Sequence, residues 1–237
     1  MQLLDSLSPP PYSLLDVGCN VGTWLHECRN RWPDTSLAGI DINTSAIAAA
    51  RNRLAGVELH EAAAEAIPFT DQSFDCVTCL EVLEHIAPMR RHCALREMWR
   101  VLRPKGRLIL TVPHAGWTAW MDANNVRFRF PRLYRYFVGC GRRDSVYSAV
   151  DRKVEWHHHF DATEVIRLAG DGWHVVTVQF GGLILFPLMD WLSWPFYRTN
   201  RSDHPLRQML ERAGRWDYRV SYGRASYGIL VVLERES

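Results

Sequence analysis

Short apolar runs that are typical of buried strands alternate with segments of helical periodicity through the first half of this sequence. The strands predicted there are Leu14–Val17, Leu37–Ile40, Val57–His60, Phe74–Leu80 and Arg107–Val112. The predicted helices are Thr23–Arg31, Ser45–Leu54 with Thr44 or Asn43 as its N-cap, and Pro88–Leu102, which Pro104 ends. Alternation of this kind is typical of a parallel sheet covered by helices on both faces, so we expect an α/β, doubly wound fold.

The second half continues this alternation but interrupts it twice. A helix is predicted at Ala162–Ala169, and strands at His174–Phe180 and Tyr227–Leu233 bring the expected sheet to seven strands. The interruptions, residues 113–156 and 181–217, are rich in aromatic and arginine residues. Loops of this length in a compact domain are usually functional or disordered. We therefore expect one domain over residues 1–237, with the two insertions as a substrate lid.

Composition and charge narrow the class of protein. The 237 residues are 47% apolar and 23% charged, which is ordinary for a globular domain, and the net charge of +2 makes a nucleic-acid partner improbable. The N-terminus lacks the pattern of a signal peptide, and no apolar run approaches the ~20 residues of a spanning helix. A cytoplasmic protein is expected. The pair Cys76 and Cys79 falls in a predicted buried strand, which favours plain thiols over a metal site.

A glycine-containing turn follows the first predicted strand and leads into a helix. Gly18 and Gly22 bracket this turn, where backbone can approach a ligand closely and the helix N-terminus offers N–H donors. About twenty residues later the second strand ends at Asp41, whose carboxylate is placed to accept hydrogen bonds from both hydroxyls of a ribose. Asn20 stands where a dinucleotide-binding turn has its second glycine, so the spacing favours a smaller adenosyl ligand over NAD.

Four blocks in this order resemble the class I S-adenosylmethionine-dependent methyltransferases, especially the methyltransferase-11 and ubiquinone-methyltransferase-like group. The blocks are Leu14–Thr23, Leu37–Ala50, Ala64–Phe69 with Ser73–Asp75, and Val101–Leu108, with Leu80–His85 between the last two. The segment from His157 to Val165 looks like the family's element before its last crossover helix. The resemblance implies a seven-stranded, mostly parallel, Rossmann-like sheet, S-adenosyl-L-methionine as cofactor, and methyl transfer as the reaction.

The resemblance also implies a role for each matching position. Asp16 and the turn of Gly18, Cys19, Asn20 and Gly22 would face the methionine end of the cofactor. Asp41 would bind the ribose and Ile42 would cover one face of the adenine. Ala63 and Ala64 would lie at the adenine edge, and Leu80 and Glu81 beneath the methionine moiety. Relatives often carry an acid before this adenine-edge block; here Ala62, Ala63 and Ala64 stand in that region, so backbone or a neighbouring group must bind the adenine amino group.

Two histidines are the candidate catalytic bases. Methyl transfer is an in-line displacement that depends mainly on positioning, and a base is needed only when the acceptor must lose a proton, as a hydroxyl does. His85 and His114 follow the fourth and fifth predicted strands. Each has the alternative of a hydrogen-bonded structural histidine, and for His85 that alternative is favoured.

Glu81, Glu84 and His85 have a spacing that would place them on one face of a helical turn. This set resembles the one in metal-using relatives, which include certain ubiquinone O-methyltransferases and the small-RNA 3′-end 2′-O-methyltransferases. A further ligand would come from the histidines at 157–159. A helix start with a solvated acid explains the same residues without a metal, and we expect no metal ligand among them.

The segment Arg127–Phe137 alternates arginine with aromatic residues, and Leu183–Tyr197 adds Phe186, Trp191, Trp194 and Phe196 within an apolar stretch. Such surfaces bind phosphates, bases or anionic lipid headgroups, or they form a lid that packs on the core. We expect O-methylation of a small-molecule, saccharide or lipid-linked acceptor, with peripheral contact to the inner membrane face as an option. The alternatives are an N- or C-methyltransferase of a small metabolite, an RNA 2′-O-methyltransferase, and a non-catalytic adenosyl-binding module. The sequence leaves the oligomeric state open.

Overall fold

A computed structural model of this chain describes residues 9–116, 119, 158–183, 185, 188, 189, 192 and 204–237. The chain divides into two compact units. The sheet unit comprises Gln2–Val112, Ala162–Val178 and Leu230–Ser237. The insertion unit comprises Met1, Pro113–Asp161 and Gln179–Ile229. The bounds of its two long segments are similar to those of the two insertions expected from the sequence. Their role as a lid stays a prediction.

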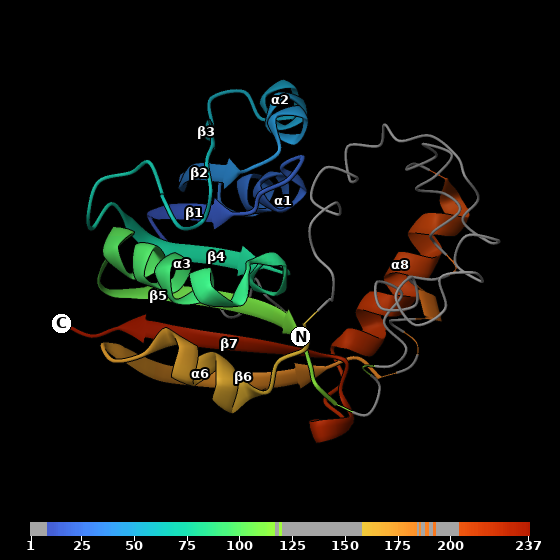
Figure 1. The fold of residues 1–237 in the computed structure, drawn as a ribbon. Helices are drawn as coiled ribbons and strands as arrows, with labels where there is room; N and C mark the ends of the chain where they lie inside the picture. The colour runs from blue at the N-terminus through green and yellow to red at the C-terminus, as the bar shows by residue number, and fades with distance from the viewer. Residues whose placement is uncertain are drawn as a thin grey trace. The chain divides into compact units, whose positions relative to one another are not determined.

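A seven-stranded sheet with the strand order β3-β2-β1-β4-β5-β7-β6 forms the core of the fold (Figure 1). The strands are β1 (Ser13–Val17), β2 (Ser36–Asp41), β3 (Glu58–Glu61), β4 (Phe74–Leu80), β5 (Leu102–Pro113), β6 (Trp173–Gly181) and β7 (Gly228–Arg235). The first five are parallel to their neighbours, and β7 runs in the opposite direction. The predicted α/β sheet of seven mostly parallel strands is confirmed.

Helices connect the strands as the alternation predicts. They are α1 (Thr23–Arg31), α2 (Thr44–Arg53), α3 (Pro88–Val101), α6 (Ala162–Ala169) and, in the insertion unit, α8 (Pro205–Tyr218), with short 3₁₀ turns η2 (Leu83–His85) and η5 (Gly223–Ala225). Of the two caps considered for α2, Asn43 is the one observed: its side chain accepts the N–H groups of Ser45 and Ala46 at 3.0 and 3.2 Å. A cap of this type stabilises a helix by about 1 kcal/mol.

The central strand β1 is buried along its whole length, and it pairs with β2 on one side and β4 on the other. Its apolar residues Leu14 and Leu15 have no exposed surface, which is why the segment appears in the sequence as a continuous apolar run. Because the strands are parallel, the carboxyl ends of β1, β2 and β4 lie at the same edge of the sheet. The residues that follow these three strands are therefore brought together.

The junction between α3 and β5 differs from its prediction. We expected the helix to reach Leu102 and the strand to begin at Arg107, but the helix ends at Val101 and the strand begins at Leu102. Phe74 pairs with Leu102 and Cys76 with Arg107, so the residues between them bulge out of the ladder. The guanidinium of Arg103 donates to Asp75 at 2.7 Å within this bulge. Regular pairing does begin at Arg107, as the apolar pattern indicates.

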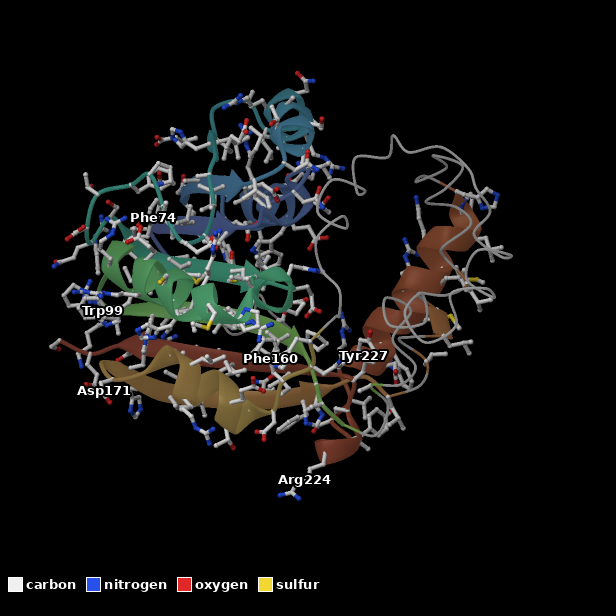
Figure 2. The ribbon with its side chains drawn as sticks, viewed as in Figure 1. Phe74, Trp99, Phe160, Asp171, Arg224 and Tyr227 are labelled. Carbon is white, nitrogen blue, oxygen red and sulfur yellow. The ribbon has the colours of Figure 1, made fainter. Side chains whose placement is uncertain are left out.

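Side-chain packing closes the far edge of the sheet unit. Trp99 on α3, labelled in Figure 2, lies under the guanidinium of Arg235, which is 3.7 Å from the centroid of its ring system. The same guanidinium donates to the carbonyl oxygen of Leu102, and the indole N–H of Trp99 donates to Gly172 at 3.2 Å. These contacts fasten the end of β7 to α3 and to the turn before β6.

Much of the insertion unit falls outside the residues that the structure describes. The segment Arg127–Phe137, His157 and most of Leu183–Tyr197 belong there, so the interpretations given to them stay predictions. Within the described part of 181–217 lies α8. No helix in the ranges described is long and apolar enough to cross a membrane.

Candidate active site

The turn after β1 has the left-handed backbone that a glycine-containing loop is expected to supply. Gly18, Asn20 and Gly22 have φ values of 78°, 48° and 74°. The N–H groups of Gly18 and Cys19 both donate to the carbonyl of Ile40, at 2.8 and 2.9 Å, which ties the turn to the end of β2. A Cβ added at Gly18 would lie 2.3 Å from Cγ2 of Val82. Asn20 adopts this conformation without a glycine's freedom, since Asn is among the residues that tolerate this region.

The carboxylate of Asp41 joins this turn to the start of α2. One of its oxygens accepts the N–H of Asn20 and the other accepts the N–H of Asn43, both at 2.8 Å. A carboxylate has about four acceptor positions, so these two bonds orient the group without saturating it. The half-buried carboxylate is thus fixed at the carboxyl end of β2, and two acceptor positions are left for ribose hydroxyls.

Apolar side chains lie on the chain segments next to this carboxylate. Ile42 is 59% exposed directly after β2, which is unusual for a large aliphatic residue and fits its predicted place against an adenine face. The N–H of Ala62 donates to the carbonyl of Asp41 at 3.1 Å, and this bond holds the segment after β3 next to the end of β2. Ala63 is half-buried and Ala64 is buried. Together with the glycine turn and Asp41, these residues fit an adenosyl ligand.

Asp16 on β1 is a buried carboxyl group, 3% exposed. The hydroxyl of Thr78 on β4 donates to it at 2.7 Å. Desolvation raises the pKa of Asp16 to about 7, and the negative charge of Asp41 acts in the same direction, while the bond from Thr78 opposes them. Asp16 therefore titrates near neutral pH in the ligand-free protein.

The residues after β4 form a tight bend that does not place Glu81, Glu84 and His85 on one face of a helical turn. Glu81 is exposed and has a φ of 56°, and its N–H donates to the carbonyl and hydroxyl oxygens of Thr111. Glu84 is 2% exposed within η2, and its Oε1 lies 3.9 Å from Nε2 of His85. The described residues contain no group of three His, Cys, Asp or Glu side chains placed to hold a metal ion. Leu80, the last residue of β4, is half-buried.

His114 lies in the insertion unit, immediately after β5. Its ring is buried, with Nδ1 2.9 Å from the carbonyl oxygen of Ser226 and an edge contact to Phe180. A carbonyl oxygen only accepts, so Nδ1 carries the proton and Nε2 is the basic nitrogen of the neutral ring. This contact supports a structural role and also sets the tautomer that a general base requires.

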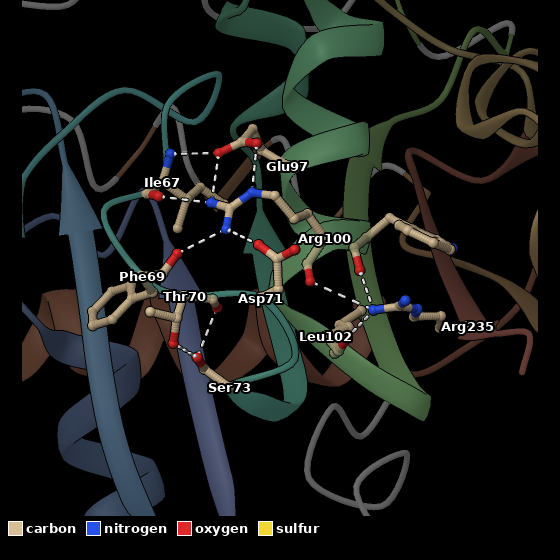
Figure 3. Close-up of polar contacts among 10 residues, drawn as sticks. Ile67, Phe69, Thr70, Asp71, Ser73, Glu97, Arg100, Leu102 and Arg235 are labelled. Atoms are coloured by element: carbon tan, nitrogen blue, oxygen red, sulfur yellow. Dashed lines mark hydrogen bonds and ion pairs between the residues drawn. The ribbon is translucent and has the colours of Figure 1, made fainter.

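The guanidinium of Arg100 holds the loop between β3 and β4, a feature that the sequence patterns did not reveal (Figure 3). It donates to the carbonyl oxygens of Ile67 and Phe69 at 2.9 and 2.8 Å, and to Asp71 at 2.7 Å. Two further bonds reach both oxygens of Glu97, and Glu97 in turn accepts the N–H of Ile67 at 3.0 Å. The bond from Arg100 lowers the pKa of Glu97, so both groups stay charged at neutral pH.

Part of this chain is similar in sequence to known methyltransferases. Residues 14–106 match the methyltransferase domain family. The chain is 34% identical over 110 residues to a demethylmenaquinone methyltransferase of Deinococcus radiodurans, covering 45% of each protein. It is 38% identical over 105 residues to a ubiquinone/menaquinone biosynthesis C-methyltransferase of Hahella chejuensis, covering 41% of each. The matches therefore span less than half the length of these relatives.

A solved structure extends the likeness in fold to the whole chain. A structure of S-adenosylmethionine-dependent methyltransferases from Methanosarcina mazei superposes with a TM-score of 0.62 at 20% identity, covering 100% of this chain and 98% of that one. At this identity the likeness shows the fold. The ligand contacts of the individual site residues stay predictions.

The first prediction concerns the ribose carboxylate. Asp41→Ala removes the acceptor of two ribose hydroxyls, which weakens S-adenosylmethionine binding by roughly 2–4 kcal/mol in calorimetry. Glu58→Ala is the control, because it removes an exposed carboxylate at the opposite end of neighbouring β3 and leaves affinity unchanged. Thermal unfolding separates lost affinity from lost folding. An Asp41→Ala protein that is folded and binds with wild-type affinity would exclude the ribose role.

The second prediction is that the affinity for S-adenosylmethionine depends on pH through the ionisation of Asp16. The cofactor's methionine end is cationic, so it binds best when Asp16 is ionised. Affinity should fall about tenfold for each pH unit below about 7 and level off above it. Asp16→Asn keeps an oxygen for Thr78 but cannot titrate, and its affinity should not change across this range.

In the ligand-free protein the same raised pKa makes the free energy of unfolding fall as pH rises from about 4 to about 7, because folded Asp16 binds its proton more tightly than unfolded Asp16 does. A pH-independent wild-type affinity would refute the assignment.

Proposed function

We propose that this chain, whose residues 14–106 match the methyltransferase domain family, is a class I S-adenosylmethionine-dependent methyltransferase that transfers a methyl group to a hydroxyl of a small-molecule, saccharide or lipid-linked acceptor. The methyl-transfer part of this proposal rests on how two groups are arranged at the carboxyl edge of the sheet. The left-handed glycine turn after β1 and the Asp41 carboxylate after β2 are fixed to each other by the hydrogen bond from the N–H of Asn20.

The cofactor, when bound, supplies a methyl group on a positively charged sulfur. The residues of this chain contribute position and electrostatics. Asp41 orients the ribose, the turn from Gly18 to Gly22 admits the ligand to the backbone, and ionised Asp16 stabilises positive charge from a buried position. Preorganised groups of this kind lower the barrier of a displacement without covalent chemistry by the protein.

The state of His114 supports a hydroxyl acceptor. A hydroxyl must lose its proton, and the carbonyl of Ser226 holds His114 in the tautomer whose Nε2 accepts one. His85 is the second candidate base and lies in η2 beside buried Glu84.

Carbon methylation of a quinone-type acceptor is the second candidate. It is favoured by the names of the relatives from Deinococcus radiodurans and Hahella chejuensis. Their similarity to this chain is confined to segments of 110 and 105 residues, which gives weaker support for the acceptor than for the cofactor. A lipid-linked acceptor would agree with peripheral contact to the inner membrane face, which is part of the proposal.

The test is incubation with methyl-labelled S-adenosylmethionine and separate cell fractions of lipid, glycan, small molecules and RNA. We expect label in the lipid, glycan or small-molecule fraction, in a product whose methyl carbon has the NMR shift of a methoxy group. A carbon-bound methyl in a quinone product would establish the second candidate instead. Label in RNA, or no label in any fraction despite cofactor binding, would overturn both.

The same assay tests His114 with a matched pair of variants. His114→Asn keeps an N–H near the position of Nδ1, which can donate to Ser226, and removes the base. It should lower the rate about 10²- to 10⁴-fold with cofactor affinity unchanged. His114→Gln carries its amide one carbon further from the backbone, so its N–H does not take the position of Nδ1. Comparing the two variants tests whether the bond to Ser226 matters for folding. A His114→Asn protein with the wild-type rate would reduce His114 to a structural residue.

A further inference from the structure

Helix α8 presents an exposed apolar stripe. Leu206, Met209 and Trp216 are 45%, 58% and 62% exposed. Positions i, i+3 and i+10 of an α-helix fall within about 80° of one another around the axis, so the three side chains share one side of α8. A single exposed apolar residue is ordinary on a protein surface, but three large ones on one side of a helix indicate an interaction surface.

The rotation of α8 about its axis is fixed by a buried acid. Asp217 is 3% exposed and accepts the N–H of Leu183 at 2.9 Å and the hydroxyl of Tyr222 at 3.1 Å. Gly214 is buried on the same side of the helix. The helix therefore turns Asp217 and Gly214 toward the rest of the insertion unit. At 100° per residue, Asp217 lies about 20° from Leu206 and about 100° from Trp216 around the helix axis. Asp217 is therefore the buried margin of the stripe on the side of Leu206, and Met209 and Trp216 are turned away from it.

Arginine side chains border the stripe. Arg212 and Arg219 are exposed and follow Met209 and Trp216 by three positions each, which places them along one margin of it. Asp217, an acid close to this region, is already engaged in the two hydrogen bonds described above. The stripe and the two arginines along its margin thus combine apolar residues with positive charge.

The charge of the two units differs in sign. By sequence the insertion unit holds 15 Lys and Arg residues and nine Asp and Glu residues, a net charge of +6. The whole chain holds 28 and 26, or +2, so the sheet unit has a net charge of −4. Positive charge is concentrated in the unit that displays the stripe, and a partner of that stripe should be anionic.

We propose that α8 is an interfacial membrane helix that binds the surface of bilayers containing anionic phospholipids. Leu206, Met209 and Trp216 enter the boundary between headgroups and acyl chains, and Arg212 and Arg219 contact the phosphates. Tryptophan is favoured at this depth, and each arginine near an anionic surface raises binding about fivefold. A helix of 14 residues is too short to span the bilayer and long enough to lie on it. This assignment does not depend on the identity of the methyl acceptor.

The test uses the full chain and sedimentation with phosphatidylcholine vesicles, with and without phosphatidylserine. The wild-type protein should pellet with the anionic vesicles, less with the neutral ones, and less as salt rises. Met209→Glu places a charge in the stripe and should weaken binding more than tenfold. Gln208→Glu makes the same charge change at the adjacent exposed position outside the stripe, and it should weaken binding no more than about threefold, since its effect is electrostatic alone.

Two results would overturn the proposal. One is wild-type protein that stays in the supernatant, or Met209→Glu protein that pellets as the wild type does. The other is a wild-type dimer in sedimentation velocity that Met209→Glu converts to a monomer, without vesicle binding, which would assign the stripe to a second copy of the chain. Because Met209 is exposed, thermal unfolding and cofactor affinity should be unchanged in this variant. A loss of vesicle binding is thereby distinguished from a failure of the proposed methyl transfer.

Discussion

The two backbone hydrogen bonds to Asp41 are the constraint on which the site depends. A half-buried carboxylate is costly unless hydrogen bonds compensate its charge, and here the compensation comes from Asn20 in the turn after β1 and from Asn43 at the start of α2. The bond from Asn20 requires its left-handed backbone, and the bond from Asn43 requires the chain to reverse directly after β2. One side chain therefore sets the relative position of two loops that are more than twenty residues apart.

The fold could be predicted because its strands and helices carry local signals. The bounds of α1, β4 and α6 agree with the apolar pattern to the residue, those of β1 differ by one residue at one end, and those of β2 differ by one residue at each end. The failure at Leu102 has a physical cause. Proline at position 104 was taken to end the helix, but the bulge that follows α3 is held by the contact of Arg103 with Asp75, a residue on another strand. Contacts across the sheet leave no periodicity in the sequence.

The same distinction separates the parts of the site that could be predicted from those that could not. The glycine turn and Asp41 occupy fixed places relative to strand ends, so the spacing of the sequence locates them. For Glu81, Glu84 and His85 the assumption of a shared helical face was wrong, because a left-handed residue at 81 precedes a single 3₁₀ turn that buries Glu84. The burial of Asp16 with Thr78 follows from the pairing of β1 with β4, which no local pattern specifies. Arg100 was missed because its partners include main-chain carbonyls.

The way Arg100 recognises its loop has a consequence for sequence divergence. The guanidinium binds the carbonyl oxygens of Ile67 and Phe69, which every amino acid possesses, and uses only one carboxylate of the loop, that of Asp71. Substitutions in the loop can therefore accumulate without moving its backbone. The exposed side chains of this loop, such as those of Ala66 and Pro68, can be exchanged for new specificity while a residue on α3 preserves the path of the chain.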